Sequence, residues 1–252
     1  MELTGSVAFV TGASGGLGAH VCRRLVDEQV RVAVGYRDGR DRADALCAAL
    51  RDIGGEAEPV QVDHTDPASV AASVSAVEQH FGALDILVNS AGMASGSHSI
   101  APGDLEAFTP EIWDEMVRVN LNGPYYLTRA ATPLLRASRW GRVVNVGSTI
   151  GHGTWGGAAA YAPSKGAVVS LTRFLAAALA PDITVNCVSP GLMEGTRMSG
   201  GAPEDFVASW KDRAALRATT GLDDVAQQIV SFCKSATMTG QEVIVDGGIH
   251  FH

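Results

Sequence analysis

The sequence predicts a doubly wound α/β fold, in which a parallel sheet of about seven strands carries helices on both faces. Two observations support this prediction. Short apolar runs alternate with longer amphipathic runs through all 252 residues, and a glycine-rich turn joins the first apolar run to the first amphipathic one. Strands covered on both faces are apolar along their whole length, and alternation with helices favours parallel pairing.

The apolar runs place the expected strands near residues 7–11, 30–36, 57–62, 84–89, 142–148, 182–188 and 241–245. Runs with apolar residues three and four apart place helices near residues 16–28, 40–52, 67–81, 110–136, 161–180 and 222–234. Asp66 before Pro67 and Thr109 before Pro110 combine a capping side chain with a first-turn proline, which marks two of the helix starts. No linker, repeat or low-complexity stretch divides the chain, so we expect one domain over residues 1–252.

Composition and charge disfavour several classes of partner. The net charge of -8 and the isoelectric point near 5.3 argue against nucleic acid and anionic membranes. No apolar run is long enough to span a bilayer, and the first residues lack the pattern of a secretory signal. Cys22, Cys47, Cys187 and Cys233 lack metal or redox spacing, so we expect reduced cysteines in a cytoplasmic protein. The histidines lack zinc-site spacing, and no metal is expected.

The turn from Thr11 to Gly18 predicts a dinucleotide site of the Rossmann type. It lies between an expected strand and an expected helix, where glycines let the backbone approach a pyrophosphate and the helix N-terminus stabilises its charge. A glycine-rich turn without a ligand is the alternative, which this position disfavours. The expected binding residues are Gly12, Ser14, Gly15, Gly16, Leu17 and Gly18.

Tyr161 and Lys165 are the main candidates for proton chemistry. A spacing of four residues places them one turn apart on one helix face, where the ammonium is expected to lower the pKa of the phenol below ~10. The tyrosine could then act as a general acid or base. Taken alone, such a pair is more often a partly buried ring beside a solvated charge. Ser148, at the end of an expected strand, supplies a further polar group.

These motifs and their order resemble the classical short-chain dehydrogenase/reductase family over nearly the whole chain. The matching segments are Thr11 to Gly18, Asp63, Asn89-Ser90-Ala91-Gly92, Asn120, Ser148, Tyr161 with Lys165, Pro190-Gly191 and Val245-Asp246-Gly247-Gly248. Gly15 beside Gly16 also fits the glycine spacing of the extended branch of that superfamily. Chain length and the four polar residues from Asn120 to Lys165 favour the classical branch.

The resemblance implies a catalytic role for four residues. Tyr161 would exchange a proton with the oxygen of a carbonyl or alcohol, and Ser148 would orient that oxygen. Lys165 would bind the nicotinamide ribose and hold down the pKa of Tyr161, while Asn120 would support a water that links Lys165 to solvent. The alternatives are that Ser148 caps a turn and that Asn120 bonds to backbone.

The resemblance also implies further cofactor contacts. Asp63 would meet the adenine amino group, although it could instead help to cap the next helix. Asn89 and Gly92 would form the floor beneath the adenosine ribose. The remaining contacts carried over from the family are His64, Ala91, Tyr161, Lys165, Pro190, Gly191 and, provisionally, Thr196.

The end of the second strand favours NADP(H) over NAD(H). Tyr36 stands where NAD-specific relatives usually have a carboxylate for the ribose 2′-hydroxyl. Arg37, with Arg40 or Arg42 nearby, can form charge-assisted bonds to a 2′-phosphate. The alternative is a solvated loop of arginines, into which Asp38 could also intrude.

A substrate pocket is expected after the fourth and fifth strands and in a glycine-rich lid at about residues 192–215. Aromatic residues and methionines there favour an apolar, ring-shaped substrate, although core or subunit contacts are equally consistent with them. The expected pocket residues are Ser148, Ile150, Trp155, Met193, Met198, Phe206 and Trp210.

The sequence therefore predicts an NADP(H)-dependent ketoreductase or alcohol dehydrogenase for a small, mostly apolar or polyketide-like ketone or alcohol. The alternatives are a 3-oxoacyl-(acyl-carrier-protein) reductase, with Arg129, Arg136, Arg139 and Arg173 as a docking patch, and a non-catalytic NADP(H)-binding regulator. The resemblance implies a homotetramer paired through the helices near 110–136 and 161–180, and the apolar stretch from 167 to 180 agrees with it.

Overall fold

Seven strands form one parallel sheet in the part of the chain that the structure describes, in the order β3-β2-β1-β4-β5-β6-β7. The structure is a computed structural model, and it describes residues 1–94, 100, 104–153 and 159–251. The strands are β1 (Val7–Thr11), β2 (Arg31–Tyr36), β3 (Ala57–Gln61), β4 (Ile86–Asn89), β5 (Gly141–Val146), β6 (Ile183–Pro190) and β7 (Glu242–Val245). All seven expected strands are confirmed, with boundaries that differ by up to two residues.

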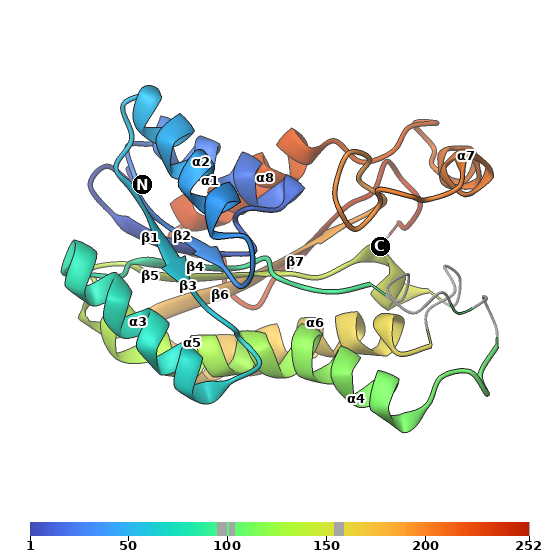
Figure 1. Cartoon of the computed structure of the whole chain (residues 1–252), viewed down its shortest axis with the longest axis horizontal. Helices are drawn as coiled ribbons and strands as arrows, with labels where there is room; N and C mark the ends of the chain where they lie inside the picture. The colour runs from blue at the N-terminus through green and yellow to red at the C-terminus, as the bar shows by residue number, and fades with distance from the viewer. Residues whose placement is uncertain (95–99, 101–103, 154–158, 252) are drawn as a thin grey trace.

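Helices cover both faces of the sheet (Figure 1). One face carries α1 (Gly16–Asp27), α2 (Arg40–Asp52) and α8 (Leu222–Lys234), and the other carries α3 (Pro67–Phe81), α5 (Gly123–Ala137) and α6 (Tyr161–Leu179). α4 (Pro110–Val117) leads into α5, and α7 (Glu204–Arg213) lies beyond the sheet near the C-terminal end of the chain. The predicted doubly wound fold is confirmed. Among the described residues, no helix is both long and apolar enough to cross a membrane.

Two apolar cores follow from this layering. The five residues of β1 are all buried because helices cover both faces of the strand, and its side chains alternate between the cores. Ala8 and Val10 pack with α1, α2 and α8, whereas Val7 and Phe9 pack with α3, α5 and α6. Each such side chain contributes about 1.5–3 kcal/mol by leaving water, so the two cores hold the strand ends in fixed positions.

The two proline-led helix starts are confirmed. The Asp66 carboxylate accepts hydrogen bonds from the backbone N–H groups of Ala68 and Ser69 at 3.0 and 3.2 Å. The Thr109 hydroxyl accepts one from the N–H of Ile112 at 3.5 Å. In both helices the cap satisfies N–H groups that have no acceptor within the helix.

Two helix predictions need correction. The single helix expected over 110–136 is divided by a π-helical turn at Arg118–Asn122, so that α4 and α5 are separate elements. The expected lid at 192–215 contains α7, which the sequence reading missed. Acidic Glu204 and Asp205 in its first turn, with Lys211 and Arg213 in its last, are the helix signal that could have found it.

Candidate active site

The sheet order creates a crevice beside β1. The chain runs outward from β1 to β2 and β3 and then returns to place β4 on the other side of β1. Segments leaving the carboxyl ends of β1 and β4 therefore diverge, which is where open α/β sheets bind ligands. Here the N–H of Ala91, two residues after β4, donates to the hydroxyl of Thr11, the last residue of β1, at 3.2 Å, so the two strand ends are joined where the segments begin to diverge.

The glycine-rich turn is packed too closely for side chains. Gly12 has a φ of +64°, and a Cβ there would lie 2.9 Å from the Cα of Ala91. A Cβ on Gly16 would lie 2.9 Å from Cγ2 of Thr196, and one on Gly18 would lie 2.4 Å from the carbonyl oxygen of Gly12. The turn thus needs glycine at these positions, and Thr196 lies directly against the start of α1.

The N-terminus of α1 has the features of an anion site. Gly15 occupies the cap position without a capping side chain, and the first turn of this helix holds no acidic residue. The free N–H groups and the positive end of the helix dipole therefore suit a pyrophosphate. Leu17 is buried in the core, so its backbone alone is available there. Ser14 lies in the turn itself.

The end of β2 combines a buried ring with arginines. Tyr36 is buried, and its hydroxyl accepts a hydrogen bond from Arg40 at 3.3 Å. Arg40 also pairs with Asp44 at 3.0 Å. The Arg37 side chain is 64% exposed and pairs with Asp38 at 2.7 Å. Arg37 and Arg40, which were predicted to favour a 2′-phosphate, therefore lie just after β2, the neighbour of β1. Asp38 forms an ion pair with Arg37.

Asp63 and His64 follow β3 with different surroundings. The Asp63 carboxylate accepts from the N–H and hydroxyl of Thr65 at 2.9 and 2.7 Å. Burial opposes ionisation of Asp63, but the two hydrogen bonds, together with the charges of Arg37 and His64, outweigh it and lower the pKa of Asp63. Burial lowers the pKa of His64 to about 4, and its ring packs against Gly123 at the start of α5. The His64 ring therefore packs against the start of α5, and its role as a cofactor contact stays a prediction.

Asn89, at the end of β4, has an internal role as well. Its amide donates to the hydroxyl of Thr128 at 3.2 Å and to the side-chain oxygen of Asn145 at 2.8 Å. Asn145 in turn donates to Thr172 at 2.9 Å. The chain of bonds ties β4 and β5 to α5 and α6, so Asn89 supports the floor of the crevice from beneath.

Asn120, Gly92 and Lys165 lie together. Asn120 is buried in the π-helical turn, where its side chain accepts from the N–H of Met93 at 2.9 Å and donates to the Met93 carbonyl at 3.0 Å. A Cβ on Gly92 would lie 3.1 Å from the Asn120 side-chain oxygen and 3.5 Å from Nζ of Lys165. Asn120 also donates to the hydroxyl of Ser164 at 3.1 Å, so it links the segment after β4 to α6.

Tyr161 begins α6 and is 8% exposed. Burial raises its pKa, and a hydrogen bond with the Ser148 hydroxyl only partly offsets that effect. The prediction that Lys165 brings this pKa below its ordinary value is therefore wrong for this arrangement, because burial is the larger effect. The pairing itself is present: Nζ of Lys165 lies 5.8 Å from the centroid of the Tyr161 ring.

Lys165 is a buried cation. It is 5% exposed, and its ammonium donates to the carbonyl oxygen of Val146 at 2.9 Å. Burial lowers its pKa to about 8, with a small opposite contribution from Cys187. An ammonium held at this depth close to Tyr161 and Gly92 is poised to meet a polar ligand in the crevice.

Only some of the candidate substrate residues lie at Tyr161, and Ser148 is one of them. Ile150 packs with the cluster around Tyr161, but Met193 packs against the core under α1. Met198 and Phe206 are exposed, and the Phe206 ring makes an edge contact with Trp210 within α7. Trp155 lies outside the described residues.

Met93 and Ala94, in the segment after the fourth strand that was expected to line the pocket, pack against the cluster of Tyr161. The sequence reading missed three other neighbours, the buried Met116 and Ala160 and the partly buried Phe108. Met116 follows Ile112 by four residues in α4, and this spacing was the available signal.

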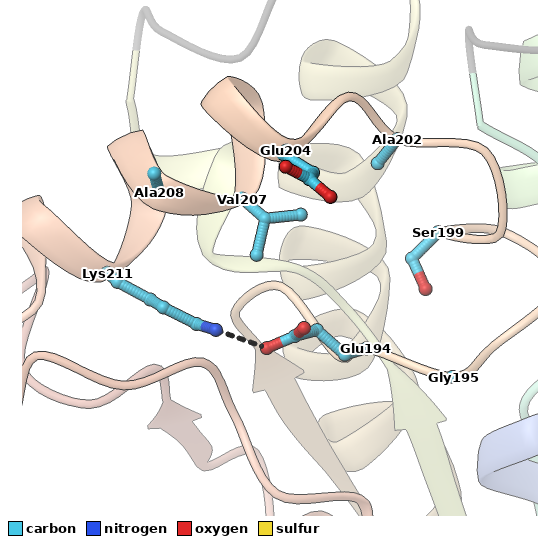
Figure 2. A pocket seen from close by; sticks show the side chains of 8 residues that line it. All are labelled: Glu194, Gly195, Ser199, Ala202, Glu204, Val207, Ala208 and Lys211. Carbon is cyan, nitrogen blue, oxygen red and sulfur yellow. Dashed lines mark ion pairs between the residues drawn. The ribbon is translucent and has the colours of Figure 1, made fainter.

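A cavity of ≈ 400 Å³ lies in the segment expected to form a lid (Figure 2). It separates the chain after β6 from α7, and the ion pair between Lys211 and Glu194 crosses it at 3.0 Å. Glu194 also accepts from the hydroxyl of Thr219 at 2.6 Å. None of the four candidate catalytic residues lines this cavity, whose walls are Glu194, Gly195, Ser199, Ala202, Glu204, Val207, Ala208 and Lys211.

Pro190 and Gly191, at the end of β6, lie against β7 and Thr220. The N–H of Gly191, just after Pro190, donates to the carbonyl oxygen of Val245 at 2.9 Å. A Cβ on Gly191 would lie 2.6 Å from the Thr220 hydroxyl oxygen.

Over the described ranges, no group of three or more His, Cys, Asp or Glu side chains is arranged to hold a metal ion.

Comparison with known proteins agrees with this architecture. A family model described as enoyl-(acyl carrier protein) reductase matches residues 12–250. A proposed ketoacyl reductase of the granaticin polyketide synthase of Streptomyces violaceoruber is 37% identical over 248 residues, which are 97% of this chain and 96% of that protein. A 3-oxoacyl-(acyl-carrier-protein) reductase of Staphylococcus aureus is 31% identical over 254 residues, covering 99% of this chain and 100% of the relative.

Solved structures give the same assignment. A short-chain dehydrogenase/reductase of Serratia marcescens has a TM-score of 0.89 at 34% identity, with 99% of each chain covered. A short-chain dehydrogenase of Burkholderia cenocepacia, solved in complex with NADP, has a TM-score of 0.88 at 33% identity, again with 99% of each chain covered. The chain thus belongs to the short-chain dehydrogenase/reductase family of oxidoreductases.

Proposed function

We propose that the protein is an NADP(H)-dependent ketoreductase that acts on a small, mostly apolar or polyketide-like ketone and catalyses the reverse oxidation of the alcohol. The observation that carries the proposal is the buried Tyr161 hydroxyl, bonded to Ser148 and one helical turn from the buried ammonium of Lys165. The name of the granaticin relative, a ketoacyl reductase, supports the same reaction class.

The chain's own groups account for the proton chemistry. A bound nicotinamide dinucleotide supplies or accepts the hydride, and the glycine turn and α1 suit its pyrophosphate. Tyr161 donates its hydroxyl proton to the carbonyl oxygen during reduction, and Ser148 holds that oxygen by a hydrogen bond. Lys165 holds its positive charge beside the ring, where it stabilises the tyrosinate left after transfer. Asn120 fixes the backbone of Met93, the residue after Gly92, which lies close to the Lys165 ammonium.

A panel of carbonyl substrates tests the function. We expect NADPH to be consumed with a bicyclic ketone, and less efficiently with a 3-oxoacyl thioester on a carrier protein. An enoyl thioester in the same panel covers the activity in the description of the matching family model. Binding of NADPH without turnover of any substrate would instead favour a non-catalytic regulator.

Reduction of carrier-bound 3-oxoacyl groups is the second candidate. Arg129 on α5 and Arg173 on α6 are exposed and could meet an acidic carrier protein. The name of the Staphylococcus aureus relative supports this substrate class. Turnover of the carrier-bound thioester far above that of every free ketone would make this the primary function.

The cofactor prediction is that Arg37→Ala removes most of a preference for NADPH over NADH. Losing a charge-assisted contact to the 2′-phosphate costs ~1.5–3 kcal/mol, roughly a ten- to hundredfold loss of NADPH affinity. Fluorescence titration of both cofactors measures this. Arg136→Ala, which removes an exposed arginine of α5 that pairs with Asp182, is the control. Equal affinities of the wild type for the two cofactors would refute the preference, which the NADP complex of a relative supports.

We also propose a homotetramer that pairs through α5 and α6. Phe174 on α6 is 63% exposed, and Ala177 and Ala178 beside it are exposed as well, so an apolar helix face is available for a second copy. Light scattering is expected to give a mass near four times the 26.2 kDa of one chain. Phe174→Glu is expected to dissociate it, whereas Ile53→Glu, at another exposed apolar residue, is not. A monomeric wild type would contradict this assembly.

The segment 192–215 is proposed to act as a substrate lid within a single domain. The cavity between Glu194 and α7 separates its two parts, and Glu194–Lys211 is an exposed ion pair of modest strength. Limited proteolysis is expected to cut first within this segment and to slow when cofactor and substrate are added. First cleavage elsewhere, with no protection by ligands, would count against a lid.

A cytoplasmic location belongs to the same proposal. All four cysteines are free thiols buried in the structure. Reduced cysteines fit a reducing compartment.

A further inference from the structure

A short turn directly after Ser148 connects the candidate active site to the edge of the sheet. The turn is the 3-10 helix Thr149–His152. At its start, the N–H of Ile150 donates to the Ser148 hydroxyl oxygen at 3.3 Å. A Cβ on Gly151 would lie 2.8 Å from the N of Gly166 and 3.0 Å from the carbonyl carbon of Lys165, so the turn lies against the backbone of α6. A shift of this turn therefore moves Ser148 relative to Tyr161 and Lys165.

Three hydrogen-bonded pairs hold the turn to β7 and the residues after it. The Thr149 hydroxyl donates to the Asp246 carboxylate at 2.7 Å and lies 2.7 Å from Nδ1 of His250. At the other end of the turn, Nε2 of His152 lies 2.6 Å from Oε1 of Glu242. Glu242 begins the last strand of the sheet and lies 90 residues along the chain from His152, and Asp246 directly follows that strand.

The Glu242 carboxylate is well enclosed. Its side chain is 7% exposed, and that of His152 is 23% exposed. The buried Ser189 hydroxyl donates to the same carboxylate oxygen at 2.5 Å. A buried carboxylate is costly unless polar groups satisfy it, so His152 and Ser189 together fix its position. The pair is therefore a rigid link, in contrast to the exposed ion pairs at the surface.

We propose that His152 and Glu242 are positioning residues for the reaction, because their pair holds the Ser148 hydroxyl in line with that of Tyr161. The inference rests on the proposed ketoreductase function. Neither residue reaches the reacting atoms in this role; both act through the turn. A misplacement of about 1 Å in a reacting geometry can lower the rate roughly 100-fold, so the link is expected to affect turnover more than cofactor binding.

The experiment compares His152→Ala with His152→Gln in steady-state ketone reduction. His152→Ala removes the contact to Glu242 and is expected to lower kcat roughly 10- to 100-fold, with KM for NADPH within about twofold of wild type. The glutamine amide can donate to the same carboxylate oxygen, so His152→Gln is expected to keep kcat within about threefold of wild type. Glu242→Gln, which keeps an acceptor oxygen for His152, is expected to behave like His152→Gln, whereas Glu242→Ala removes the same contact from the other side and replaces His152→Ala if that variant fails to fold.

Lys234→Met is the matched control, since it breaks the 2.7 Å pair of Lys234 with Glu28 that links α1 to α8. Its kcat is expected to stay at the wild-type value. A His152→Ala enzyme with wild-type kcat, or a His152→Gln enzyme as slow as His152→Ala, overturns the inference and leaves the proposed function intact. A wild-type enzyme that reduces no ketone or thioester overturns the proposed function, and the inference falls with it.

Discussion

Replacing Tyr161 by Phe is expected to lower kcat by ~10²- to 10⁴-fold, the usual contribution of general acid catalysis. The substitution removes only the hydroxyl that bonds to Ser148, and leaves a ring of the same shape in the cluster with Met116 and Ala160. Because the glycine turn and α1 lie elsewhere in the crevice, NADPH affinity is expected to stay close to wild type. Ketone reduction and cofactor titration on one preparation measure both quantities.

Tyr126→Phe is the control for that experiment. Tyr126 is a half-buried tyrosine of α5 whose ring contacts Tyr125, so the same atom is removed far from the proton chemistry. Its kcat is expected to match that of the wild type. Activity of Tyr161→Phe within a few-fold of wild type would falsify the assignment of the proton donor.

Lys165→Met is expected to abolish most activity and yet to make the free protein more stable at neutral pH. Burial lowers the pKa of Lys165 from 10.5 to about 8, a lowering that corresponds to roughly 3 kcal/mol of unfavourable free energy at pH 7. The variant also loses the hydrogen bond to the Val146 carbonyl, which destabilises it by about 1 kcal/mol. We therefore expect a net gain of about 1–2 kcal/mol in the free energy of unfolding at pH 7.

The sign of the pH dependence follows from proton binding. Below pH 8 both states carry the Lys165 proton, and the folded state bears the full cost of the buried charge. Between about pH 8 and pH 10.5 the unfolded chain keeps a proton that the folded chain has lost, so wild-type stability rises relative to the Met variant.

Thermal unfolding at pH 7 and pH 10 checks this expectation. The advantage of Lys165→Met should be largest at pH 7 and shrink by pH 10, at about 2–4 °C of melting temperature per kcal/mol. Lys234→Met, which removes a surface ammonium paired with Glu28, is expected to show no gain at pH 7. A Lys165→Met protein less stable than wild type at pH 7 would show that the buried charge is compensated.

Much of the crevice was predictable because its signals are local. Thr11 to Gly18 carries strand, turn and helix start in consecutive residues, and the structure brings Gly12 against Ala91 as a close backbone approach requires. The capped starts at Asp66 and Thr109 were found for the same reason. In these places the short-range sequence determines the conformation with little help from tertiary contacts.

Other features depended on distant contacts. The apolar spacing through 110–136 is that of a continuous helix, but the side chain of Asn120 bonds to the backbone of Met93, and the helix adopts a π turn there. Spacing placed Tyr161 near Lys165 correctly, yet the direction of the pKa shift depends on burial by other elements. The substrate residues were chosen by chain position, and the orientation of Met193 and Met198 is set by packing that position does not encode.

The strand order, in which the chain forms β2 and β3 on one side of β1 before it adds β4 on the other, has a consequence for the order of folding. Thr11 faces Asn89 across the two strands, so the floor of the dinucleotide crevice joins residues far apart in the sequence. A growing or partly folded chain that has formed β1, α1 and β2 possesses the glycine turn but lacks its opposite wall. Contacts of such long sequence separation form late, after the entropy of closing the intervening loop has been overcome. The wall of the crevice opposite the glycine turn is therefore complete only once β4 has paired with β1.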